Sequence, residues 1–338
     1  MKTKKRHILK LNDRQKEKKM GINTWLVIPC FNEQEILNYT IECLDKKMED
    51  LEQRGIISRE SKMVFVDDGS TDKTWSIINE ASKKYERIVG IKLAHNKGHQ
   101  NALLAGMMYV KDKSDCMISL DADLQDDIDV MEQFVMKYKE GAQIVYGVRN
   151  NRQTDSKFKR GTANLFYKIM KVLGAETINN HADYRLMSRQ ALEALEEYEE
   201  TTLFLRGIVP IIGMKTDKVF YERKERKAGE TKYPFVKMAG FALDGITSFS
   251  VKPLRLIALL GILFSGISIL GLMYALASYF FGYTVPGWTA IVFSIWLLGG
   301  IQLLCIGVVG EYIGKIFSEV KRRPRYYIEQ EVKFHSKQ

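Results

Sequence analysis

Two carboxylates stand one residue apart, Asp121 and Asp123, directly after a short apolar run. At this spacing in a loop, both can bind one divalent cation, because Mg²⁺ and Mn²⁺ prefer oxygen ligands and keep positions open for substrate phosphate oxygens. Such a cation would neutralise the charge that develops on a diphosphate leaving group. An isolated Asp-x-Asp is more often a solvated acidic loop. The prediction of a metal site here depends on similar motifs after the neighbouring runs.

Polar motifs follow three other apolar runs in the first hundred residues. In chain order they are Pro29 with Asn32 and Glu33, then Asp67 with Asp68, and then Asn96 with Lys97. A carboxylate after the second run can accept a hydrogen bond from a nucleobase N–H, and Lys97 or an exposed backbone N–H can contact phosphate. The alternative for the second motif is a helix start with Ser70 or Thr71 as its N-cap. The two roles are compatible.

The apolar runs alternate with polar segments of helical length, which predicts strands separated by helices. The expected strands cover residues 24–30, 62–67, 87–93, 115–120, 142–147, 181–187 and 215–221, and helices are expected near 162–173 and 189–198. Short, continuously apolar strands are typical of a parallel sheet covered on both faces. Ligands of such sheets bind at the carboxyl ends of the strands. The polar motifs therefore fall on the edge where a site is expected.

A second region has a different composition. Residues 256–310 contain no charged residue and no histidine over 55 positions. One helix of this length would extend about 80 Å, far beyond the ~30 Å hydrocarbon core of a membrane. A turn at Gly282–Gly287 predicts two spans, 256–281 and 289–310, and basic flanks place both outer ends in the cytoplasm. A buried soluble hairpin is the alternative.

The net charge of +10 is concentrated at the N-terminus, where nine basic and two acidic residues fall within the first twenty. This segment is either a solvated tail or a surface for anionic lipid headgroups, and without a recognition motif we expect no nucleic-acid partner. Residues 234–252 predict a helix in the membrane interface. The four cysteines lack metal-type spacing, and no apolar signal follows the basic N-terminus. Glycines in the apolar spans can support close packing in a homo-oligomer.

Together, these motifs resemble those of family-2 glycosyltransferases. With two C-terminal spans, residues 22–325 resemble the polyprenyl-phosphate glycosyltransferases, such as bactoprenol glucosyltransferases and dolichol-phosphate mannosyltransferases. The resemblance implies an α/β, GT-A-like nucleotide-sugar fold with a mostly parallel sheet. It also places Asp67 or Asp68 at the base and Asp121 and Asp123 at Mg²⁺ or Mn²⁺, with Gln125 beside them.

Further matches concern the acceptor. Arg149 and Arg160 resemble the basic pair that receives the lipid phosphate, and Asp183 lies in a segment similar to the family's Asp-Phe-Arg-Leu, with Tyr184 in place of Phe. Asp183 is thereby a base or an orienting carboxylate. Arg226, Thr231 and Lys232 match a Gly-x-Ser-Lys-Tyr loop, with Thr231 in place of Ser. These residues complete the expected catalytic and acceptor-binding set.

The expected function is inverting transfer of one sugar to polyisoprenyl (undecaprenyl) phosphate from a nucleotide diphosphate sugar, with UDP-glucose or UDP-N-acetylglucosamine as examples. The expected layout is a basic tail (1–21), a catalytic domain (22–233), a juxtamembrane segment (234–253), a membrane hairpin (254–310) and a cytoplasmic tail (311–338). The catalytic domain and both termini would lie on the cytoplasmic side of the inner membrane. A processive polysaccharide synthase is disfavoured because no tryptophan follows an arginine, and a non-catalytic nucleotide-binding scaffold because both acidic motifs are intact.

Overall fold

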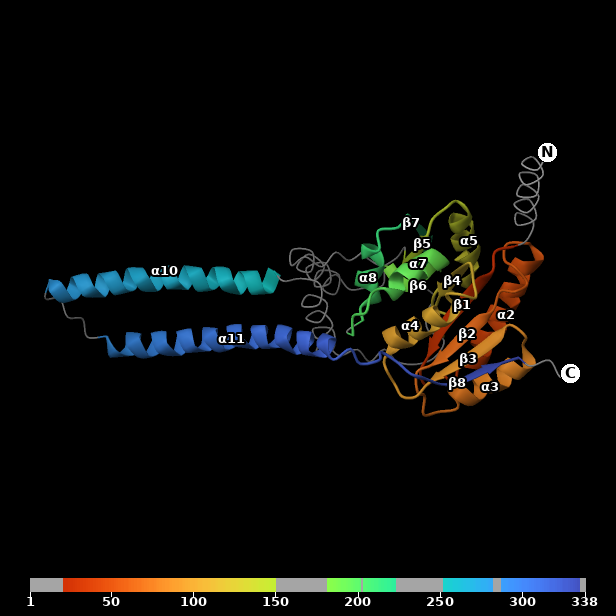
Figure 1. Ribbon diagram of the computed structural model, residues 1–338, viewed down its shortest axis with the longest axis horizontal. Helices are drawn as coiled ribbons and strands as arrows, with labels where there is room; N and C mark the ends of the chain where they lie inside the picture. The colour runs from red at the N-terminus through yellow and green to blue at the C-terminus, as the bar shows by residue number, and fades with distance from the viewer. Residues whose placement is uncertain (1–20, 150–180, 202, 223–251, 282–286, 335–338) are drawn as a thin grey trace, which may run out of the picture. The chain divides into compact units, whose positions relative to one another are not determined.

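The computed structural model describes residues 21–149, 181–201, 203–222, 252–281 and 287–334. The chain divides into two compact units (Figure 1). The first consists of Met1–Gly161, Ile178–Lys232 and Pro324–Gln338, and it contains the sheet. The second consists of Thr162–Thr177 and Tyr233–Arg323, and it contains two long helices. The expected helix near 162–173 and the juxtamembrane segment up to residue 251 lie outside the described residues.

The first unit is built on an eight-stranded sheet with the order β7-β5-β6-β4-β1-β2-β3-β8. Its strands are β1 Thr24–Cys30, β2 Met63–Asp67, β3 Ile88–Leu93, β4 Cys116–Ser119, β5 Ile144–Arg149, β6 His181–Ser188, β7 Thr216–Tyr221 and β8 Ile328–Lys333. Its helices are α2 Leu37–Gln53, α3 Thr74–Lys84, α4 His99–Val110, η1 Ile128–Val130, α5 Met131–Lys139, α7 Arg189–Glu196 and α8 Leu205–Ile211.

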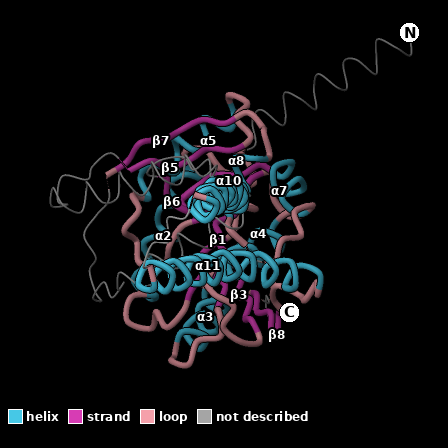
Figure 2. Tube along the Cα trace, turned by 90° about the vertical axis from the view of Figure 1, so that its left-hand side faces the viewer, coloured by secondary structure: helices cyan, strands magenta, loops and turns pink. Residues whose placement is uncertain are grey.

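Strands β4, β1, β2 and β3 are parallel neighbours, and the sequence predicts their positions to within one or two residues. Helices cover both faces, and Figure 2 shows α2 and α4 on opposite sides of β1. Leu26 and Ile28 belong to the core cluster that includes residues of α2 and α5. On the other face α4 lies so close that a Cβ on Gly106 would lie 2.4 Å from Val27 Cγ1. The expected mostly parallel, doubly covered sheet is confirmed.

The remaining strands introduce antiparallel pairs that alternation alone does not predict. β6 runs antiparallel to both β4 and β5, while β7 pairs in parallel with β5. The carboxyl end of β5 therefore lies beside the amino end of β6, where Val148 pairs with His181. This reversal brings residues of β6 to the edge at which the parallel strands end.

The C-terminal segment forms the eighth strand instead of the expected tail. β8 pairs antiparallel with β3, Trp75 Nε1 donates to Gln330 Oε1 at 3.0 Å, and Tyr109 OH donates to Glu331 Oε1 at 2.9 Å. Four of the six residues in β8 have charged or amide side chains. The segment therefore lacks the apolar signal by which the central strands are recognised.

The second unit contains α10, Lys252–Phe280, and α11, Trp288–Val320. They correspond to the helices expected over 256–281 and 289–310, and α11 continues ten residues past its expected end. Among the described residues, one segment is long and apolar enough to cross a membrane by length and composition, Leu297–Val320 of α11. The two-span topology therefore stays a prediction.

Candidate functional site

The loops that follow β1 and β2 are joined by hydrogen bonds. Asn32, whose φ of 55° is in the left-handed region, donates its N–H to Ser70 Oγ at 3.0 Å and accepts from the Thr71 N–H at 2.9 Å. The Glu33 N–H donates to Thr74 Oγ1 at 2.9 Å. Two predicted site residues, Asn32 and Glu33, are thus fixed against the acidic motif of β2. Pro29 is buried within β1.

Asp68 connects this edge to the loop after β3. Its Oδ1 accepts the Lys97 N–H at 2.7 Å and its Oδ2 accepts the Gly98 N–H at 2.9 Å. The carboxylate is buried, which raises its pKa, and the two hydrogen bonds oppose that shift. The backbone N–H groups of Lys97 and Gly98, which were expected to contact phosphate, therefore donate to Asp68. Asn96 lies in the loop that these hydrogen bonds hold.

Asp67 is buried beside Asp68 but has different partners. Its Oδ1 accepts the Ser70 N–H at 3.3 Å, while Oδ2 is a buried oxygen without a hydrogen-bond partner among the described residues. Burial raises the pKa of Asp67. A Cβ on Gly69 would lie 2.6 Å from the Asn96 nitrogen, so only glycine fits this close approach. Of the two acidic side chains, Asp67 is the one with an oxygen that accepts no hydrogen bond from the part of the chain that the structure describes.

The loop after β4 carries Asp121 and Asp123 and is held from two sides. Thr40 Oγ1 donates to the Ala122 carbonyl at 2.6 Å, and the Gln125 N–H donates to Asp123 Oδ1 at 3.1 Å. Leu124 has a φ of 51°, which gives the loop a tight turn. The predicted carboxylate pair therefore lies on a structured loop at the carboxyl edge of the sheet.

Asp121 lies among other carboxylates, with His99 as its nearby positive partner. Its pKa is raised to about 6, mainly by burial; His99 opposes the shift, and the carboxylates of Asp126, Asp183 and Asp123 add to it. Its side chain is nevertheless 39% exposed. Carboxylate oxygens that repel one another suit a hard divalent cation. Within the described residues no group of three or more His, Cys, Asp or Glu side chains is placed to hold a metal ion, so the metal site at Asp121 and Asp123 stays a prediction.

Asp183 is held by two arginines. Arg185 Nη2 lies 2.5 Å from Oδ1, and Arg206 donates from Nε to Oδ1 at 3.2 Å and from Nη2 to Oδ2 at 3.0 Å. Burial alone would raise the pKa of Asp183, but His99 and the two guanidinium groups hold it well below its usual range. His99 Nε2 lies 3.6 Å from Asp183 Oδ2 and 3.8 Å from Asp121 Oδ1. A carboxylate this stabilised as an anion is a weak base.

Arg149, at the end of β5, is held by two buried groups. Its Nε donates to the Tyr221 hydroxyl at 3.2 Å, its Nη2 lies 3.4 Å from Asp126 Oδ1, and Tyr221 OH donates to Asp126 Oδ1 at 2.5 Å. Burial alone would lower the pKa of Arg149, but Tyr221 and Asp126 raise it. The arginine is thus a fixed cation at the same edge.

The site in the structure contains some of the predicted residues and also residues that were not predicted. Arg160, Arg226, Thr231 and Lys232 lie outside the described residues. Residues that the sequence reasoning did not assign are His99, Asp126, Arg206 and Tyr221. Asp126 and His99 had a signal, because Asp126 closes the acidic motif that begins at Asp121 and His99 directly follows the motif at Asn96–Gly98. Arg206 and Tyr221 stand apart from any motif.

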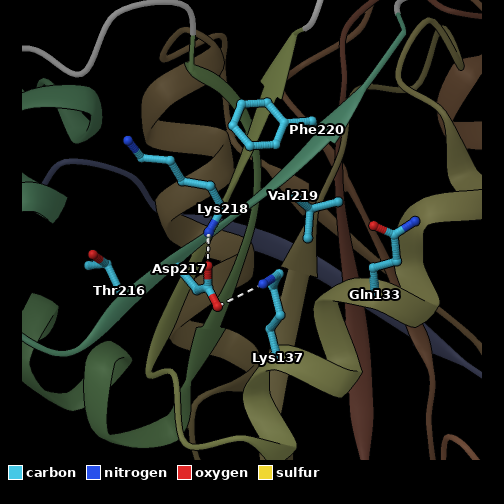
Figure 3. A pocket seen from close by; sticks show the side chains of 7 residues that line it. All are labelled: Gln133, Lys137, Thr216, Asp217, Lys218, Val219 and Phe220. Carbon is cyan, nitrogen blue, oxygen red and sulfur yellow. Dashed lines mark hydrogen bonds and ion pairs between the residues drawn. The ribbon is translucent and has the colours of Figure 1, made fainter.

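A groove of about 560 Å³ lies between α5 and β7 (Figure 3). Its lining consists of Gln133, Lys137, Thr216, Asp217, Lys218, Val219 and Phe220. Lys137 Nζ lies 2.8 Å from Asp217 Oδ2, so these two charges form a pair, and Lys218 adds a second positive charge to the lining. None of the predicted site residues lines this groove.

Comparisons with known proteins agree with the geometry. Residues 25–196 match the family described as Glycosyl transferase family 2. The uncharacterized glycosyltransferase YkoT of Bacillus subtilis is 53% identical over 304 residues, covering 90% of each chain. The prophage bactoprenol glucosyl transferase homolog of Escherichia coli is 40% identical over 90% of this chain and 98% of its own.

A solved mannosyltransferase of Pyrobaculum calidifontis, in complex with GDP-Man and Mn²⁺, is a distant match. It has 12% identity, a TM-score of 0.41, and coverage of 89% of this chain and 87% of that one. This structural likeness is too low to support any argument about chemistry. The family match and the two relatives are sufficient to assign the family. The chain is a glycosyltransferase and belongs to family 2.

Proposed function

We propose that the protein transfers one sugar, with inversion, from a nucleotide diphosphate sugar to a polyisoprenyl phosphate such as undecaprenyl phosphate. The observation that carries the proposal is the line of contacts Asp121–His99–Asp183–Arg206, each below 4 Å. It sets a carboxylate suited to a cation beside an arginine suited to phosphate. Relatives named bactoprenol glucosyl transferase, at 39–40% identity over 90% of this chain, support a lipid phosphate acceptor.

On the donor side, Asp67 Oδ2, which has no hydrogen-bond partner among the described residues, is the acceptor proposed for a base N–H. A UDP-sugar such as UDP-glucose or UDP-N-acetylglucosamine is the proposed donor. Asp121 and Asp123 would hold Mg²⁺ or Mn²⁺, which neutralises the departing diphosphate when bound. Asn32 and Glu33 shape the loop beside the base. In this account Asp68 and the Lys97 N–H build the pocket wall, because they bind each other.

On the acceptor side, little base catalysis is needed. A phosphate monoester has a second pKa near 6, so its oxygen is already an anionic nucleophile at cytoplasmic pH. Its attack on the anomeric carbon forms the new C–O bond while the bond to the diphosphate breaks, inverting that carbon. Asp183, with its lowered pKa, positions arginines instead of accepting a proton. Arg149 is proposed to bind the acceptor phosphate, together with Arg160, Arg226, Thr231 and Lys232.

Membrane attachment follows from the same proposal. The acceptor is a lipid, and Leu297–Val320 of α11 has the length and composition of a span. We propose that α10 supplies a second span, that the active site and both termini are cytoplasmic, and that the protein lies in the inner membrane. Divalent metal would be needed for activity, with Mg²⁺ and Mn²⁺ both suited to the carboxylates.

The test is direct. The full chain in detergent is incubated with radiolabelled nucleotide sugars, Mg²⁺ or Mn²⁺ and undecaprenyl phosphate, and the product is extracted into organic solvent. We expect a lipid-soluble product that carries one sugar and is lost on chelation of the metal. A polymeric product would indicate a processive synthase, and no incorporation from any donor would indicate a nucleotide-binding scaffold. Asp112→Ala, at a highly exposed carboxylate, is the matched control for substitutions in the site.

A further inference from the structure

Arg206 is a partly exposed cation whose orientation is fixed by a buried carboxylate. Its Nε and Nη2 both donate to Asp183, at 3.2 and 3.0 Å, in a two-point contact. The side chain is nevertheless 43% exposed, whereas that of Asp183 is buried. An arginine held along one edge of its planar guanidinium group keeps further N–H donors in known directions.

Asp183 does not need Arg206 for neutralisation. Arg185, with an exposure of 0%, lies 2.5 Å from Asp183 Oδ1 and also donates to the Leu205 carbonyl at 3.4 Å. Two guanidinium groups on Asp183 leave one positive charge beyond that carboxylate, and of the two only Arg206 presents it to solvent. A guanidinium group that is fixed in orientation and faces solvent suits an anionic ligand, since charge-assisted hydrogen bonds to phosphate are among the strongest that arginine makes.

The position of Arg206 relates this charge to the reaction. Asp183 Oδ2 contacts both Arg206 and His99, and His99 also lies 3.8 Å from Asp121. We infer that Arg206 binds a phosphate group of a substrate and that Asp183 is the residue that positions it. This inference rests on the proposed function for the identity of the substrates. The shared chemistry is a phosphate oxyanion, from either the donor diphosphate or the acceptor monoester.

The competing role is purely structural, with Arg206 serving only to hold Asp183. That role predicts lower stability or turnover on substitution, without a change in the affinity for phosphate. The two roles are separated by a binding measurement that requires no turnover. The full chain in detergent is titrated calorimetrically with inorganic pyrophosphate in the presence of Mg²⁺, which represents the donor, and with geranyl phosphate, which represents the acceptor.

Arg206→Gln is expected to weaken the binding of one probe by about tenfold or more, the scale of one charge-assisted contact. Arg206→Lys keeps the charge but loses the two-point contact, so we expect an intermediate loss. Arg189→Gln is the matched control, because Arg189 is also about half-exposed and contacts Asp115 at 3.7 Å, outside the site. We expect this control to bind both probes as the unaltered chain does.

The probe that is lost identifies the source of the phosphate, and the matching KM should rise in the transfer assay. Wild-type affinity for both probes in a folded Arg206→Gln chain overturns the inference, as does failure of the unaltered chain to bind either probe. If Arg206→Gln does not fold, the same criteria apply to Arg206→Lys. Absence of any lipid-linked sugar would remove the proposed function, while the two titrations would still decide the role of Arg206.

Discussion

Two acidic motifs lie on the same edge of the sheet and use their charges differently. After β2, both oxygens of Asp68 accept backbone N–H groups from the loop after β3, so the carboxylate holds two loops together. After β4, Asp121 faces three other carboxylates, and its pKa is raised to about 6. A carboxylate whose charge is matched by backbone donors builds structure, whereas one whose charge is unmatched is set up for a ligand.

The largest expected effect is on the rate of sugar transfer, and it comes from the acidic motif after β4. Asp123→Ala removes one of the two carboxylates proposed to hold the cation, and electrostatic groups of this kind contribute on the order of 10³-fold to a rate. We expect radiolabel transfer to fall at least that far, with a normal unfolding transition. Near-normal turnover would refute the metal site, and Asp112→Ala provides the control.

Asp183→Asn tests a third carboxylate, whose negative charge is neutralised by ion pairs with Arg185 and Arg206. The substitution leaves the fully buried Arg185 without an anionic partner, and an uncompensated buried charge costs about 3–5 kcal/mol. We expect the free energy of unfolding, measured by chemical denaturation in detergent, to fall by that amount, and transfer to fall with it. A change in stability below about 1 kcal/mol would contradict this role.

Asp68→Asn tests the carboxylate whose two oxygens accept backbone N–H groups. An amide keeps one acceptor oxygen but cannot accept the second backbone N–H, so one buried hydrogen bond is lost at a cost of about 1–3 kcal/mol. We expect a lower thermal unfolding midpoint and, below that midpoint, a loss of transfer of less than about tenfold. If transfer instead falls as far as in Asp123→Ala while the midpoint stays unchanged, Asp68 contacts substrate.

The smallest effect concerns pH and the cation. The pKa of Asp121 is raised from 3.8 to about 6, so between these values the native state keeps a proton that the unfolded chain has released. Stability of the cation-free protein should therefore decline as pH rises through this window. A cation competes with that proton, so the rise in unfolding midpoint on adding Mn²⁺ should be larger at pH 7.5 than at pH 5.

Each kcal/mol of stabilisation corresponds to about 2–4 °C in a domain of this size. Differential scanning fluorimetry at the two pH values measures the difference. Asp121→Asn should abolish this difference between the two pH values, while Asp68→Asn should retain it. An equal shift at both pH values in the unaltered chain would mean that the cation binds without displacing a proton from Asp121.

The central strands and the positions of the acidic motifs could be predicted from the sequence, because short β-branched runs and the loops that follow them are local features. β1 was predicted residue for residue. The different hydrogen bonding of Asp67 and Asp68 was not predictable, since it depends on backbone N–H groups about 30 positions further along the chain. Arg206 was missed for the same reason: its partner Asp183 lies 23 positions earlier, and no pattern relates the two.

The eighth strand has a consequence for how the protein is made. β8 follows both long helices in the chain, yet it covers the β3 edge of a sheet whose other strands come before them. During translation this edge stays unpaired until the ribosome has passed α11, and an unpaired edge is a template for association with other chains. The nascent protein therefore completes its sheet only after its apolar helices have left the ribosome.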